Sequence, residues 1–153
     1  MMKNGWDDKY IVCMIGNKLC GKTTLANAFK TGNIIIKSAF VEAYPFSKDG
    51  SVIVVDTESI SEDAYSLEKD GLSILGVNEV LQTGRAFKLI LVLNVEELCA
   101  NQGKENLVQQ LTYVSRLLNQ EYFGDRHDLK HLIEPVFVKF GDFGKDTILH
   151  KLE

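Results

Sequence analysis

Short apolar runs alternate along the chain with longer segments of mixed character. The runs are rich in valine, isoleucine and leucine, which is typical of buried strands. Pro45, Asp49 and Gly50 mark a turn in the first third of the chain. Several runs are apolar throughout, which indicates strands that are covered on both faces of a parallel sheet. The pattern predicts strands at residues 10–15, 33–41, 51–56, 87–93 and 135–140.

The segments between these strands carry apolar residues at helical spacing. Residues 104–123 are the best example, because their apolar side chains recur along one face. Residues 24–30 predict a short helix, residues 61–82 a loop with one or two helices, and residues 142–152 a final helix. Strands joined by helix-length connections predict an α/β fold, with a mostly parallel sheet of about five strands and helices on both faces. We expect a single domain over residues 1–153.

A phosphate-binding pattern lies between the first strand and the first helix. Residues 16–23 read Gly-Asn-Lys-Leu-Cys-Gly-Lys-Thr and fit G-x-x-x-x-G-K-[ST] at every fixed position. The glycines allow the backbone to approach a phosphate closely, and the loop N–H groups and the helix N-terminus attract anions. Lys22 would neutralise charge between the β- and γ-phosphates as the catalytic residue, and the Thr23 hydroxyl would ligate Mg²⁺. The alternative is an ordinary turn with an exposed lysine.

The pattern also defines the set of residues that we expect to contact the nucleotide. Most of them would do so through backbone N–H groups. They are Gly16, Asn17, Lys18, Leu19, Cys20, Gly21, Lys22, Thr23 and Thr24.

An aspartate supplies the expected second half of the site. Asp56 ends the apolar strand at residues 51–56, and ligands of parallel α/β sheets gather at the carboxyl ends of the strands. We therefore expect Asp56 to face the phosphate loop and to hold Mg²⁺ directly or through a water. The alternative is an aspartate that caps the following turn or helix.

Composition and charge narrow the classes of function. The net charge of −4 and the absence of any lysine or arginine block give no nucleic-acid footprint. No apolar run approaches membrane-spanning length. Cys13, Cys20 and Cys99 are odd in number and widely spaced, which favours reduced thiols in the cytoplasm over a disulfide framework or a zinc site.

At these residues the chain resembles the GTPase branch of the phosphate-loop NTPases. The resemblance is carried by residues 16–23 and by the Val-Val-Asp-Thr-Glu-Ser run at residues 54–59. Within that branch the chain is similar to the immunity-associated GTPases related to septins, through the apolar strand at 88–93, Glu-Tyr-Phe-Gly-Asp at 121–125 and the strand at 136–140. The resemblance implies the three-layer phosphate-loop NTPase fold, GTP as ligand and Mg²⁺ as cofactor.

Two family motifs are altered in this chain. Ser59 stands where the D-x-x-G motif has its glycine, and a side chain there restricts the backbone. The base-recognition motif N/T-K-x-D corresponds to Val138, Lys139 and Asp142, with one extra residue before the aspartate. The resemblance implies that Lys139 lies along the purine and that Asp142 pairs with guanine. A surface lysine and a helix-capping aspartate explain these two residues equally well.

The groups that would drive hydrolysis are weakly represented. Ser38 and Ser47 are the remaining hydroxyls for a second Mg²⁺ contact between the first helix and Asp56. Arg85 is the only arginine before residue 116, so no arginine finger is indicated. Because positioning and charge stabilisation supply most phosphoryl-transfer catalysis, we expect slow hydrolysis or none.

The sequence therefore predicts a cytoplasmic domain that binds a purine nucleoside triphosphate, with GTP favoured over ATP, and Mg²⁺. Two alternatives stay open: a small-molecule or nucleotide kinase built on the same loop, and a degenerate GTPase-like module without catalysis. A protein partner or a homodimer is compatible with each. The chain stops within its last expected helix, so either the sheet is one strand short or the sequence is a fragment of a longer protein.

Overall fold

The described residues form a mixed sheet of six strands at the centre of the fold, in the order β2-β3-β4-β1-β5-β6. The computed structural model describes residues 7–17, 20–29, 32–37, 41–58, 67–100, 103–118 and 132–138. Its strands are β1 (Tyr10–Gly16), β2 (Ile36–Lys37), β3 (Val41–Pro45), β4 (Val52–Thr57), β5 (Ala86–Asn94) and β6 (Ile133–Val138). The last four in spatial order, β4, β1, β5 and β6, are parallel, whereas β3 is antiparallel to both β2 and β4.

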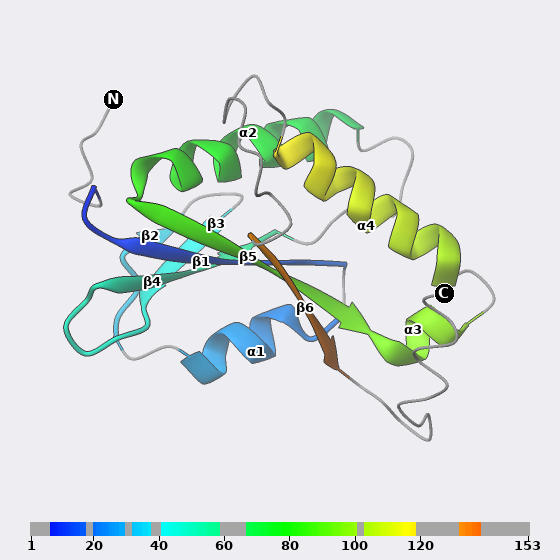
Figure 1. Cartoon of the computed structure of the whole chain (residues 1–153), viewed down its shortest axis with the longest axis horizontal. Coiled ribbons are helices and arrows are strands. Elements are labelled where there is room, and N and C mark those ends of the chain that lie inside the picture. The colour runs from blue at the N-terminus through cyan, green and yellow to red at the C-terminus, as the bar shows by residue number, and fades with distance from the viewer. Residues whose placement is uncertain are drawn as a thin grey trace.

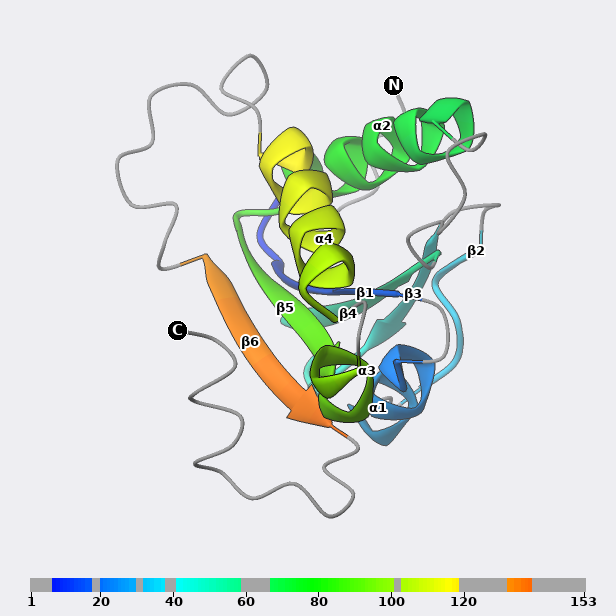
Figure 2. The same cartoon turned by 90° about the vertical axis from the view of Figure 1, so that its right-hand side faces the viewer.

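Helices cover the two faces of this sheet. They are α1 (Lys22–Phe29), α2 (Leu67–Thr83), α3 (Val95–Cys99) and α4 (Gly103–Leu117). Helix α1 lies on one face, and α2 and α4 lie together on the other (Figures 1 and 2). The expected α/β architecture, with a mostly parallel sheet between two helical layers, is confirmed.

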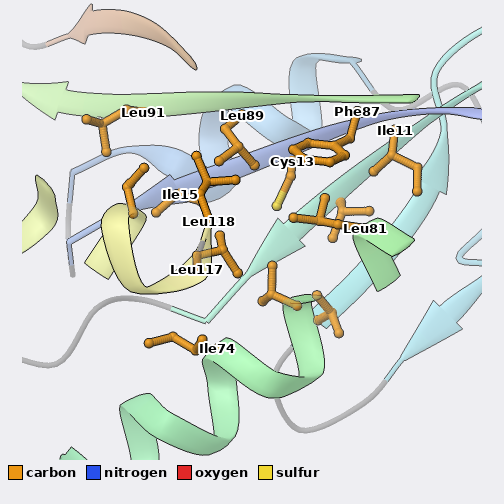
Figure 3. Packing of buried hydrophobic residues seen from close by; sticks show 14 of the residues in the cluster. Ile11, Cys13, Ile15, Ile74, Leu81, Phe87, Leu89, Leu91, Leu117 and Leu118 are labelled. Atoms are coloured by element: carbon orange, nitrogen blue, oxygen red, sulfur yellow. The ribbon is translucent and has the colours of Figure 1, made fainter. Parts of the chain in front are cut away.

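Alternation along β1 divides the core into two parts. Side chains of successive strand residues point to opposite faces of a sheet. Ile11, Cys13 and Ile15 therefore pack towards α2 and α4, in the larger cluster shown in Figure 3. Met14 points to the other face and packs in a smaller cluster with Ala26 of α1. The strand that leads into the phosphate loop is thus fixed from both sides.

Short strands replace the long one expected at residues 33–41, where the prediction was wrong. Ile34 and Ile35 are 40% and 46% exposed, so this β-branched run is not a buried strand. Strand β2 has only two residues, and the next strand, β3, extends through Pro45. Pro45 was expected in the turn but is paired with Ile53 at the end of the ladder, where a missing N–H costs little.

The remaining elements follow the sequence pattern with small shifts. The described part of the segment that was expected to hold one or two helices, from Leu67 onwards, forms helix α2. Helix α3 follows β5 directly, and its N-cap Asn94 accepts a hydrogen bond from the Glu97 N–H. The expected end of the long helix at 119–123 and the final helix at 142–152 lie outside the described residues.

A compact hydrogen-bonded turn joins β3 to β4. The Asp49 carboxylate accepts hydrogen bonds from the Ser47 hydroxyl at 2.6 Å and from the Ser51 N–H at 3.0 Å. Gly50 occupies the positive-φ position, with φ of 69°. The Ser47 hydroxyl, followed by the two hydrogen bonds from Ser51, lowers the pKa of Asp49 from 3.8 to about 2.

This turn leads to a pH-dependent stability prediction. Because the pKa of Asp49 is lower in the folded chain than its ordinary value, its contribution is present above pH 3.8 and is lost as the pH falls towards 2. Asp49→Asn should therefore lower the melting temperature at pH 7, and the difference from wild type should shrink below pH 3.8. Melting curves between pH 7 and pH 2 measure this, with the exposed Asp7→Asn as control. A difference that is constant with pH would contradict the assignment.

Candidate phosphate-binding site

The loop between β1 and α1 lies at the carboxyl edge of the parallel strands. Gly16 is the last residue of β1 and is paired with Val92 of β5. The Cys20 N–H donates to the Asn17 carbonyl at 3.3 Å, so the chain turns back over the strand end. Gly21 then has a φ of 93°, a conformation that residues with a side chain rarely adopt. The predicted strand, loop and helix therefore occur in the expected order; Lys18 and Leu19 lie outside the described residues.

Lys22 is the first residue of α1 and is only 4% exposed. Its ammonium group donates to Asp56 Oδ1 at 3.3 Å and to the Thr57 carbonyl. Lys22 is therefore buried and not exposed, unlike the lysine of the ordinary-turn alternative, and phosphate binding by the loop stays a prediction. Lys22 thus places a buried ammonium group at the start of α1, next to the carboxyl end of β4.

Asp56 lies opposite the loop, as expected from its place in the strand. It is paired with Met14 across the parallel β1–β4 ladder, and it is 7% exposed. A buried carboxylate is retained only when it is paired or binds a cation, and here Lys22 supplies the partner. The β1–β4 register thus brings together two groups that are 34 residues apart in the sequence.

Thr57 completes the contact and was not among the predicted site residues. Its hydroxyl donates to the Met14 carbonyl at 2.8 Å, and its own carbonyl accepts from Lys22. The hydroxyl therefore ties the end of β4 to β1 just before the loop. The sequence feature that could have indicated this role is the threonine directly after Asp56. A β-branched residue at such a position is ordinarily explained by its preference for strands.

The ion pair borders the dry interior of the sheet. Burial raises the pKa of the Cys13 thiol to about 12; the Lys22 ammonium ion opposes this shift and the Asp56 carboxylate adds to it. The Cys13 thiol is therefore protonated and is no nucleophile. The same surroundings screen the Lys22–Asp56 attraction less than bulk water would.

The residues present fit a bound phosphate and a Mg²⁺ ion. Both polar atoms of the Asn17 side chain are buried without a hydrogen-bond partner in the described part of the chain, so the loop holds polar groups that a ligand could satisfy. The described residues contain no cluster of three or more histidine, cysteine or acidic side chains. Asp56 and the exposed Thr23 would thus leave most Mg²⁺ ligands to phosphate and water, as this ion prefers.

Of the other predicted site residues, some lie away from the Lys22–Asp56 contact and some lie outside the described residues. Ser47 is in the β3–β4 turn, next to the amino end of β4, so it cannot supply a Mg²⁺ ligand at the opposite edge. Thr24 is exposed on the first turn of α1. Ser38, Ser59, Lys139 and Asp142 lie outside the described residues, so the base-recognition and switch expectations stay predictions.

A separate apolar cavity of about 170 Å³ lies between α1 and the sheet. Its walls include Met14, Leu25 and Phe29, and every lining residue is apolar. A phosphate in this cavity would lose its hydrogen bonds to water, and the apolar walls offer none to replace them. The cavity is therefore no candidate for the anion site.

No helix within the described ranges combines the length and the apolar character needed to cross a membrane. No protein-family model matches the sequence. No curated protein matches it either.

Solved structures give weak fold-level matches. A point mutant of S. thermophilus NFeoB bound to mGDP has 16% identity and a TM-score of 0.49, over 94% of this chain and 60% of that one. A second NFeoB mutant, bound to GDP, has 15% identity and a TM-score of 0.48, over 94% and 61%. The small COPII coat GTPase SAR1 from Encephalitozoon cuniculi, in complex with GDP, has 14% identity and a TM-score of 0.36, over 95% and 78%.

The chain thus spans about 60% of the length of the NFeoB structures that it matches. Identities and TM-scores this low identify no family. The phosphate-loop interpretation rests on Gly16 to Thr23, on the strand and helix around them, and on the contact between Lys22 and Asp56.

Proposed function

We propose that this chain binds a purine nucleoside triphosphate, with GTP favoured, together with Mg²⁺, and hydrolyses it slowly or not at all. The observation that carries the proposal is the buried Lys22 at the start of α1, directly facing Asp56 at the carboxyl end of β4. A cationic loop beside a carboxylate supports binding of a phosphate chain and its metal ion at one place. The preference for GTP derives from the resemblance of the sequence motifs alone.

The loop, the metal ligands and the base-contacting residues would each bind a different part of the nucleotide. Backbone N–H groups of the loop would cradle the phosphates, and Lys22 would neutralise charge on the β/γ bridge. Thr23 and Asp56 would hold Mg²⁺, which when bound neutralises phosphate charge and orients the phosphate oxygens. Lys139 and Asp142 would contact the base.

Slow hydrolysis is supported by the place of the arginines. Arg85 lies over the Tyr10 ring, 5.6 Å from its centroid, at the amino ends of β1 and β5. The phosphate loop is at the other end of β1, so Arg85 cannot stabilise charge on a transferring phosphoryl group. Among the described residues the other arginine is Arg116, in the last turn of α4.

The three cysteines support a cytoplasmic protein, because none of them forms a disulfide bond and Cys13 and Cys20 are buried. The proposal also includes binding of this chain to a protein partner or to a second copy of itself.

Titration of wild-type protein with GTP, ATP and their diphosphates, each with Mg²⁺, tests the proposal. Phosphate release without an acceptor would identify an NTPase, and phosphoryl transfer to an acceptor would identify the kinase alternative. Tight binding without turnover would identify the non-catalytic module. Binding of none of these nucleotides would overturn the proposal.

The metal part of the proposal gives its own prediction. Thr23→Ala should weaken binding of GTP by about tenfold in the presence of Mg²⁺, the equivalent of about 1.4 kcal/mol, because one oxygen ligand is lost. Binding in excess EDTA should be unchanged. Thr23→Ser keeps the hydroxyl and should behave as wild type. Equal losses with and without Mg²⁺ would mean that Thr23 does not act through the metal.

A further inference from the structure

The Lys22 ammonium group already has two acceptors among the described residues. Asp56 Oδ1 accepts one N–H at 3.3 Å, and the Thr57 carbonyl accepts another. An ammonium group has three N–H donors, and the buried position of Lys22 leaves little freedom to add strong partners. A phosphate that needs this cation must therefore compete with acceptors that belong to the chain itself.

The carboxylate is the stronger of these two competitors. Asp56 is charged and buried beside Lys22, and the Cys13 thiol beneath them lies in fully desolvated surroundings. An ion pair in such surroundings is screened far less than one at the surface. The Thr57 hydroxyl, bonded to the Met14 carbonyl, fixes the end of β4 so that Asp56 stays within reach of Lys22.

A divalent cation changes the balance of this contact. Asp56 would ligate the cation, and the cation would then repel the neighbouring ammonium group while it neutralises the carboxylate. Lys22 would be released towards the phosphates at the same moment. Binding of the cation and binding of the phosphates are therefore coupled. When Asp56 binds the cation it releases Lys22, and when Lys22 binds the phosphates it releases Asp56.

We propose that Asp56 acts as an internal competitor for Lys22, so that the chain binds nucleotide weakly until a divalent cation engages Asp56. This inference rests on the proposed function, because it concerns the order of events at the same site. It assigns Asp56 two roles, a metal ligand in the loaded site and an inhibitor of phosphate binding without metal.

Affinity for GDP, measured by calorimetry with excess EDTA and with Mg²⁺, tests the proposal. Asp56→Asn should strengthen binding in EDTA by about tenfold, within the usual range of coupling between ligands, and should abolish the gain from Mg²⁺. The matched control is Glu58→Gln, which removes the same charge two residues away. It should change the affinity for GDP in EDTA less than twofold, because the proposed effect comes from the contact of Asp56 with Lys22 and not from repulsion between any nearby carboxylate and the phosphates.

A second measurement examines the ion pair in protein without added nucleotide. Lys22→Met should lower the melting temperature, and Asp56→Asn added to it should restore part of the loss, because the lone buried carboxylate is removed. If wild type binds GDP but Asp56→Asn leaves the EDTA affinity unchanged, or if Glu58→Gln raises it equally, the inference is overturned and the proposed function stands. If wild type binds no nucleotide, both are overturned.

Discussion

The variant Lys22→Met is expected to lose nucleotide binding and to lower the free energy of unfolding by about 3–5 kcal/mol. Methionine keeps the apolar length of the side chain but removes the ammonium group. Asp56 would then be a buried carboxylate without its cationic partner, which is the costly way to break an internal ion pair. The phosphates would lose the ammonium group that is proposed to neutralise the charge between the β- and γ-phosphates.

The matched control is Lys88→Met, which breaks the pair between Lys88 and Glu134. That pair has a similar distance of 3.2 Å, but its side chains are 48% and 56% exposed. An exposed ion pair contributes about 0–1 kcal/mol to stability. The free energy of unfolding and the nucleotide affinity of Lys88→Met should therefore be close to those of wild type. Chemical denaturation and GTP titration measure both variants. Equal stability of the two variants would contradict the burial of Lys22.

The variant Gly16→Ala is expected to disrupt the loop itself. A Cβ at this position would lie 2.5 Å from Cys20 Sγ and 3.0 Å from the Val92 carbonyl oxygen. The sulfur lies on a short side chain and the oxygen on backbone, so the loop must shift away from β5. Overpacking of this kind costs about 1–3 kcal/mol, and a displaced loop should bind GTP at least as poorly as the Thr23→Ala variant.

Two further variants sharpen this prediction. Gly71→Ala adds the same methyl group within α2, where a Cβ meets nothing within 4 Å, and it should stabilise the chain by about 0.5–1 kcal/mol. Combining Gly16→Ala with Cys20→Ala removes the sulfur and should recover part of the lost stability and affinity. No recovery in this double variant would show that the Val92 carbonyl, or another contact, causes the damage.

The position of Asp56 opposite the loop could be predicted from the sequence because the two segments involved are each recognisable locally. A loop with fixed spacing joins a buried strand to a helix, and Asp56 ends a second apolar strand. Parallel pairing then brings the two strand ends to one edge, so the contact between Lys22 and Asp56 follows from topology. No long-range packing detail was needed.

Other features depend on contacts that the sequence pattern does not contain. The Thr57 hydroxyl has a role only because the β1–β4 register places it beside the Met14 carbonyl. The run around Ile34 has strand propensity, but its side chains find no core, and context overrides propensity in strands. Pro45 was misplaced because a proline is tolerated at the end of a ladder as well as in a turn.

Residues 16–23 are proposed to bind the phosphates of a nucleotide, and isothermal titration of wild-type protein with GTP in the presence of Mg²⁺ measures this binding. We expect saturable binding at one site per chain, and loss of this binding in Lys22→Met. Absence of saturable binding of GTP and of ATP by folded wild-type protein would contradict it.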